Sequence, residues 1–115
     1  MRFTGMLLAA LLMSACTGPG AQHLDDAQLV KTLEQQVRLP KDASPLSDYT
    51  RYYTLTADGM LVGVYVKDFD GGDRQAHLVS KREMPLILDG GCSVINVRYD
   101  PDANKVLRVF CNGIA

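Results

Sequence analysis

The chain has 115 residues, with 12 Lys plus Arg and 13 Asp plus Glu, and its formal net charge at pH 7 is −1. This length corresponds to one small domain with a limited hydrophobic core. Nucleic acids and acidic membrane surfaces are bound through clustered basic charge, and the sequence contains no basic run. The composition therefore implies neither of them as a partner.

The first 15 residues have the layout of a signal peptide. Arg2 supplies positive charge, and an apolar stretch of eight residues follows at 6–13. A membrane-spanning helix needs about 20 apolar residues, so this stretch is too short to cross a bilayer. We therefore expect residues 1–15 to be cleaved off, which also removes Arg2 and leaves a formal net charge of −2.

The apolar stretch ends in Leu-Met-Ser-Ala-Cys at residues 12–16. This pattern resembles the lipobox of bacterial lipoproteins, although Met13 stands where Leu is usual. In that family a peptidase cuts before the Cys, which then carries a diacylglyceryl group and often a further acyl chain such as palmitate. The resemblance implies that Cys16 is the lipidated first residue of the mature protein. The alternative is an ordinary secreted protein cut at Ala15 or Ala21.

The resemblance also implies a location and a domain layout. Thr17, and not Asp, follows Cys16, which by the sorting rule of bacteria with two membranes favours the outer membrane, facing the periplasm. Two or more acyl chains anchor a protein stably without inserting its fold into the bilayer. Residues 16–24 are then the lipidated Cys and a flexible tether, and residues 25–115 form a single small domain.

The two remaining cysteines predict a disulfide. Cys92 and Cys111 form an even pair, and disulfides persist in the oxidising compartment that a signal peptide implies. The alternative is two buried free thiols. A metal site is disfavoured, because the chain has no Cys-x-x-Cys and its histidines, His23 and His77, are far from both cysteines in sequence. We expect neither a metal nor a cofactor.

A helix is predicted over residues 26–38, with Asp25 or Asp26 as its N-cap. Its apolar residues share one helical face: Leu29, Val30, Leu33 and Val37. Leu39-Pro40 ends the pattern. The narrow stripe favours packing on a sheet, and docking into a partner's groove is the alternative.

The rest of the domain is predicted to be strands, at residues 49–56, 60–67, 75–80, 93–99 and 105–111. The first two flank the hairpin turn Ala57-Asp58-Gly59, and the last two flank a turn at residues 100–104. Residues 84–88 are ambiguous, because Pro85 suits an edge strand, a loop or the start of a short helix. The predicted fold class is α+β, with one N-terminal helix packed on an antiparallel sheet of about five strands connected as a meander of hairpins.

Two signals conflict over the register of the last hairpin. A three-residue bulged loop puts the apolar residues of both strands on one face, namely Ile95, Val97, Tyr99, Leu107 and Val109, but it sends the two cysteines to opposite faces. A register shifted by one residue places the cysteines opposite each other and brings Arg108 onto the apolar face. A bulge near the open end of the hairpin would reconcile the two.

The sequence offers few residues with catalytic chemistry. His77 is the imidazole that remains in the domain, and Ser80 and Ser93 lack the Gly-x-Ser-x-Gly context of an activated nucleophile. The acidic segment 68–73 is predicted to be a plain loop, because no Glu follows at the distance that a twelve-residue calcium loop requires. We expect a protein that is not an enzyme.

Tyrosines concentrate in the first hairpin. Because side chains alternate along a strand, Tyr52 and Tyr53 point to opposite faces, and one of them should be exposed. Tyr and Arg are enriched at the centres of interfaces, so Tyr52, Tyr53, Tyr65 and Arg108 are candidates for an interaction surface. The alternative is that the tyrosines cover a small core with their hydroxyls in water.

These features together favour a membrane-anchored periplasmic lipoprotein that serves the cell envelope as a non-enzymatic binding or structural accessory. Its expected partners are the membrane, through the lipid anchor, and an envelope protein. The alternative is an inhibitor or binder of a secreted hydrolase such as lysozyme, resembling the small lipoproteins that inhibit lysozyme, whose motifs this sequence does not contain.

Overall fold

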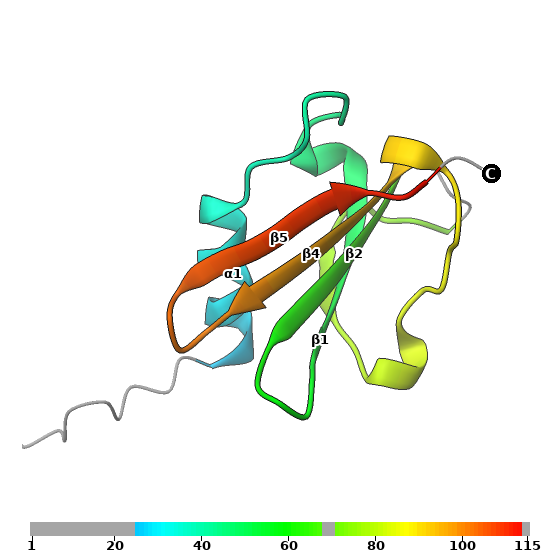
Figure 1. Ribbon diagram of the computed structural model, residues 1–115. Helices are drawn as coiled ribbons and strands as arrows, with labels where there is room; N and C mark the ends of the chain where they lie inside the picture. Colours follow the sequence, from blue (N-terminus) through cyan, green and yellow to red (C-terminus); the bar gives the residue numbers. More distant parts are fainter. Residues whose placement is uncertain (1–24, 68–70, 114–115) are drawn as a thin grey trace, which may run out of the picture.

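A computed structural model of the protein describes residues 25–67 and 71–113. The predicted signal peptide, Cys16 and the tether lie outside the described residues. Within these residues one α-helix packs on a five-stranded sheet (Figure 1), and the elements are α1 (Asp26–Gln36), β1 (Tyr49–Leu55), β2 (Leu61–Lys67), β3 (Ala76–Leu78), β4 (Val94–Asp100) and β5 (Lys105–Cys111). None of the helices in this part of the chain is both long enough and apolar enough to span a bilayer.

The sheet is mixed, so the predicted antiparallel meander is wrong. The strand order is β3-β1-β2-β4-β5, with β3 parallel to β1 and the other neighbours antiparallel. After β2 the chain does not turn back beside it, because β4 occupies that side of β2. It crosses instead to the far side of β1, where β3 is held by hydrogen bonds from Arg51 N to Gln75 O and from Val79 N to Tyr53 O, both 2.8 Å long.

The helix also differs from its prediction. It starts at Asp26, as predicted, but it ends at Gln36, two residues before the predicted end at Arg38. Asp25 caps its start, accepting a hydrogen bond from Gln28 N at 2.8 Å. Val37 already has extended backbone, and Pro40 restricts Leu39 to extended backbone, so the helix does not resume after Val37.

We call the side of the sheet that α1 covers the inner face. The core lies between this face and the helix, and its buried residues are Val30, Leu33, Tyr49, Tyr53, Leu61, Tyr65, Ile95, Val97 and Tyr99. Four of the nine are tyrosines, an unusual choice for a core because each hydroxyl needs a hydrogen-bond partner.

A buried polar cluster supplies partners for two of these tyrosines. Glu34 on α1 accepts hydrogen bonds from Arg51 Nε at 2.9 Å, from Arg51 Nη2 at 3.2 Å and from the Tyr53 hydroxyl at 2.6 Å. The Tyr53 and Tyr65 hydroxyls lie 2.7 Å apart in a further hydrogen bond. The cluster of Glu34, Arg51, Tyr53 and Tyr65 therefore joins α1 to β1 and β2, the two strands of the first hairpin.

The last hairpin adopts neither predicted register over its whole length, and Cys111 lies opposite Ile95 rather than Cys92. Ile95 pairs with Cys111 and Val97 with Val109, but a bulge between Arg98 and Tyr99 brings Tyr99 opposite Val106. The bulge lies near the closed end of the hairpin, not the open end, and it turns Leu107 outward to 46% exposure.

The predicted disulfide between Cys92 and Cys111 is present, with 4.6 Å between the Cα atoms. The conflict over the face of Cys92 disappears because Cys92 precedes β4, in the 3-10 helix η3 (Gly91–Ser93), where strand alternation does not apply. Tyr49 donates a hydrogen bond from its hydroxyl to Cys92 O at 2.6 Å, so the core also contacts this end of the sheet.

Gly63 on β2 makes room for the packed tyrosine rings, and we predict that Gly63→Ala destabilises the domain. A Cβ atom there would lie 2.8 Å from Tyr53 Cε1 and 3.3 Å from Tyr65 Cε1. We expect the free energy of unfolding in urea to fall by about 1–3 kcal/mol, the usual cost of overpacking. Gly113→Ala is the matched control, because nothing lies within 4 Å of its Cβ position. An equal loss in both variants would contradict close packing at Gly63.

We also predict a loss of stability at alkaline pH. Burial raises the pKa of Tyr53 and of Tyr65 above the ordinary value of 10.0, and the carboxylate of Glu34 adds to both shifts. Above pH 10 the unfolded chain loses phenolic protons that the folded chain retains, so stability falls as pH rises, by up to about 1.4 kcal/mol per pH unit for each such group.

The measurement is urea unfolding at a series of pH values between 7 and 11, followed by circular dichroism. The double variant Tyr53→Phe/Tyr65→Phe should lose less stability over the alkaline range, although it is less stable at neutral pH. A profile of the same slope in both proteins would show that these hydroxyls do not govern the alkaline loss.

Candidate functional site

The structure separates the four residues predicted to form an interaction surface. Tyr53 and Tyr65 are completely buried in the inner-face core, so they do not form an accessible surface. Tyr52 is half-buried and stacks on His77 with 5.6 Å between ring centroids. Arg108 is exposed, and its guanidinium lies 4.3 Å from the centroid of the Phe110 ring.

The other side of the sheet, which we call the outer face, carries the candidate site. Alternation along the strands directs Val62, Val64, Arg98 and Arg108 to this face. No α-helix of the described residues covers it, and the chain between β3 and β4 crosses part of it (Figure 1). This crossing segment begins with the 3-10 helix η2 (Lys81–Glu83).

We call residues 84–88, Met-Pro-Leu-Ile-Leu, the strap. Just before it Ser80 and Glu83 form a capping box, in which Glu83 Oε1 accepts a hydrogen bond from Ser80 N at 3.2 Å; the Ser80 hydroxyl donates to the same oxygen at 2.8 Å. This hydrogen bond also lowers the pKa of Glu83. At its end Asn112 Nδ2 donates to Ile87 O at 2.7 Å and to Asp89 O at 2.9 Å.

The anchored strap presents two leucines to solvent. Leu86 is 86% exposed and Leu88 is 83% exposed, the highest fractions among the large exposed hydrophobic residues of the described chain. The fold therefore displays apolar side chains on a backbone that follows a capped 3-10 helix and is held at its far end by Asn112.

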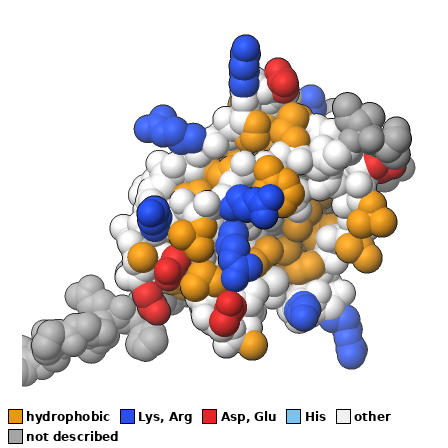
Figure 2. Space-filling model, in the orientation of Figure 1, with side chains coloured by type: hydrophobic (Ala, Val, Ile, Leu, Met, Phe, Trp, Pro, Cys, Tyr) orange, Lys and Arg blue, Asp and Glu red, His pale blue; other side chains and the backbone are white. Residues whose placement is uncertain are grey.

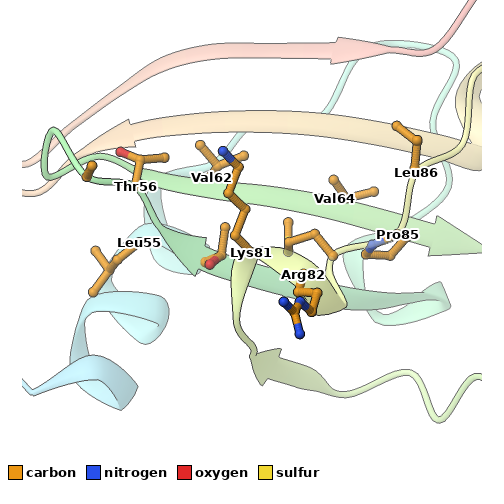
Figure 3. A pocket seen from close by; sticks show the side chains of 11 residues that line it. Leu55, Thr56, Val62, Val64, Lys81, Arg82, Pro85 and Leu86 are labelled. Atoms are coloured by element: carbon orange, nitrogen blue, oxygen red, sulfur yellow. The ribbon is translucent and has the colours of Figure 1, made fainter.

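A groove of about 580 Å³ lies between the strap and the sheet (Figure 3). Its apolar lining comes from Val62 and Val64 on β2, from Leu55 at the end of β1, and from Met84, Pro85 and Leu86 of the strap. Its polar lining includes Thr54 and Thr56. The side chains of a central strand thus form the floor, and the strap forms the opposite wall.

Basic residues from two distant parts of the sequence gather around this groove. Lys81 and Arg82 belong to its lining, and Arg98 and Arg108 face each other across β4 and β5 on the same side of the sheet. Figure 2 shows Lys and Arg side chains lying on and around an apolar surface.

Carboxylates near the groove are already engaged. Asp58 accepts hydrogen bonds from the Thr56 hydroxyl and from Arg98, the latter at 3.3 Å. The bond from Thr56, and to a smaller extent the charge of Arg98, lower the pKa of Asp58. Glu83 accepts a hydrogen bond from Ser80. The groove lining itself contains two cations, Lys81 and Arg82, and no carboxylate.

His77 lies at the opposite edge of the sheet from β5 and does not belong to the groove lining. Its Nε2 atom lies 2.8 Å from Asp73 Oδ1, and this hydrogen bond, together with one from Gln75 N, lowers the pKa of Asp73. Asp68 and Asp70 of the predicted acidic loop lie outside the described residues. Across residues 25–67 and 71–113, no cluster of three or more His, Cys, Asp or Glu side chains is placed to hold a metal ion.

Sequence reasoning missed the strap and the groove. The signal for the strap was present, because residues 84–88 are uniformly apolar and follow the basic pair Lys81-Arg82. Uniform hydrophobicity suits a buried segment as well as an exposed one, so the sequence did not show which of these residues face solvent.

No family model, no curated protein and no solved structure matches this chain. The use of the outer face must therefore be inferred from its own shape, hydrophobicity and charge.

We predict that Asn112→Ala loosens the strap. The substitution removes the donor to Ile87 O, in a half-buried contact, and to Asp89 O, in an exposed one, and it also removes the acceptor for Asn96 Nδ2 on β4. Each such hydrogen bond contributes about 0.5–1.5 kcal/mol. Amide hydrogen exchange over the strap should become faster, while exchange in β1 and β2 changes little. Gln35→Ala, at an exposed position of α1, is the control. If the strap exchanges at the native rate in Asn112→Ala, Asn112 does not anchor it.

Proposed function

We propose that this protein is a non-enzymatic binding accessory of the cell envelope, held at a membrane through a lipidated Cys16, and that it binds its partner with the strap and the groove. The observation that carries the proposal is the anchored display of Leu86 and Leu88 beside an apolar groove. Contiguous exposed apolar surface of this kind is typical of interaction sites.

The energetics of the strap support binding. Burial of one Leu side chain contributes about 1.5–3 kcal/mol, so two leucines at more than four-fifths exposure leave a favourable contribution unused in the free protein. The capping box and Asn112 restrain the strap before any partner arrives. Less conformational entropy is therefore lost on association than with a flexible loop.

The groove lining supports binding rather than catalysis. Catalysis of acyl or glycosyl transfer requires a positioned acid, base or nucleophile, most often His, Cys, Asp or Glu. The lining supplies apolar groups, threonine hydroxyls and two cations, and His77 lies elsewhere with Asp73 and Tyr52. Its chemistry suits recognition of a ligand without bond formation.

The distance between anchor and domain limits where the partner can be. Nine residues, 17–25, separate Cys16 from the start of α1. Fully extended, they reach about 30 Å, so a lipidated protein holds its domain within about that distance of the bilayer. Thr17 favours the outer membrane and the periplasm, and the Cys92–Cys111 disulfide suits such an oxidising compartment.

The test is cross-linking of the full chain in its native host, followed by affinity isolation and mass spectrometry. We expect enrichment of an envelope protein, and we expect Cys16→Ser to abolish it. The double variant Leu86→Asp/Leu88→Asp should reduce the enrichment at least tenfold, because removal of an interface hot spot costs more than about 1.4 kcal/mol. Leu107→Asp makes the same change at an exposed site on β5 and should leave the enrichment unchanged.

Circular dichroism spectra and melting temperatures of the variants check that the fold is retained. Enrichment that persists in the folded Leu86→Asp/Leu88→Asp variant would contradict the strap as the binding surface. Enrichment that persists in Cys16→Ser would contradict the role of the lipid anchor.

A further inference from the structure

We propose that the groove under the strap binds the acyl chain of an anionic amphiphile and that Lys81 and Arg82 bind its head group. This inference rests on the proposed binding role of the outer face and names the class of ligand. The occupant has an apolar tail and one negatively charged head, as fatty acids and acidic phospholipids have.

The size and lining of the groove fit such a tail. Its volume of about 580 Å³ lies within the roughly 300–1,000 Å³ that is typical of small-molecule sites. Val62 and Val64 provide a floor of aliphatic side chains, and Met84, Pro85 and Leu86 provide the facing wall. Met84 adds an unbranched, adaptable side chain, which suits a flexible ligand.

The charge at the groove fits an anionic head. Lys81 and Arg82 are exposed members of its lining, and the lining contains no carboxylate. Figure 3 shows Lys81 reaching from the segment before the strap across the groove, with its amino nitrogen near Val62. The neighbouring carboxylates have other hydrogen-bond partners, since Asp58 bonds Thr56 and Arg98 and Glu83 bonds Ser80.

An amphiphile fits this site better than an added peptide strand. A peptide strand binds through backbone groups at the edge of a sheet, but the groove is floored by β2, whose two edges are paired with β1 and β4. The β2 floor of the groove therefore offers side chains and no unpaired strand edge. A ligand that needs few hydrogen bonds and carries one charged end matches what the groove supplies.

The first experiment compares two probes with the same tail and opposite heads. Dodecanoate and dodecyltrimethylammonium are titrated, below their micelle concentrations, into the Cys16→Ser form of the full chain. Methyl NMR signals of Val62, Val64 and Met84 report on the groove itself. We expect dodecanoate to shift these signals saturably and to bind at least tenfold more tightly than the ammonium probe.

Matched variants separate the tail from the head. Val64→Trp should fill the groove and abolish the shifts of Val62 and Met84. The control variant Leu107→Trp on β5 should bind dodecanoate normally. If Val64→Trp does not fold, Val62→Phe is used in its place. Lys81→Glu/Arg82→Glu should weaken dodecanoate at least tenfold. Arg38→Glu/Lys41→Glu makes the same change in net charge at exposed sites outside the groove lining and should have no such effect.

A flotation assay with vesicles distinguishes the two sources of the ligand. Binding to phosphatidylglycerol–phosphatidylcholine vesicles that Val64→Trp abolishes would assign the amphiphile to a bilayer, and binding of dodecanoate without vesicle binding would assign a free amphiphile. Equal affinity for the two probes would overturn the role of Lys81 and Arg82. Failure of both probes to shift the groove methyls would overturn the whole inference. If neither probe binds but cross-linking to an envelope protein still depends on Leu86 and Leu88, the proposed function stands. The groove would then bind a side chain of that partner protein.

Discussion

The contact between Arg51 and Glu34 holds together the parts of this structure that the sheet alone cannot join. Arg51 donates to both carboxylate oxygens of Glu34 on α1, and its Nη1 donates to Tyr49 O at 3.0 Å and to Arg74 O at 3.1 Å. Burial lowers the pKa of Arg51, but the hydrogen bond and charge of Glu34 raise it by more, so the guanidinium stays charged. One side chain thereby fixes the helix on the inner face and positions the segment that leads into β3.

The position of β3 then determines where the outer-face site can form. Because β4 is antiparallel to β2, and β2 is antiparallel to β1, β4 runs in the same direction as β3. A connection between parallel strands must travel the length of a strand over one face of the sheet. The inner face is occupied by α1, so residues 79–93 cross the outer face, and the strap and the groove are consequences of that route (Figure 1).

The sequence was informative where the structure depends on local signals. Turn residues located both hairpins, and the even pair Cys92 and Cys111 predicted the disulfide. The sequence was not informative where the structure depends on contacts between residues that are far apart in the chain. β3 has three residues and no hairpin turn, so nothing local places it beside β1. The sequence pattern around Tyr53 and Tyr65 does not show which faces of their strands are buried. Both can be buried because Gly63 leaves space for their rings, because Glu34 accepts a hydrogen bond from Tyr53, and because the two hydroxyls bond each other.

The charge of the outer face illustrates the same dependence on tertiary structure. The whole chain is nearly neutral, and no basic run is visible in its sequence, yet the crossing segment and the last hairpin bring Lys81, Arg82, Arg98 and Arg108 to one face. Arg98 and Arg108 lie directly opposite each other, an arrangement of like charges that destabilises a sheet. Asp58 and the ring of Phe110 offset part of that repulsion. An anion bound at this face would offset more of that repulsion, so an arrangement that costs the isolated domain stability favours a negatively charged ligand.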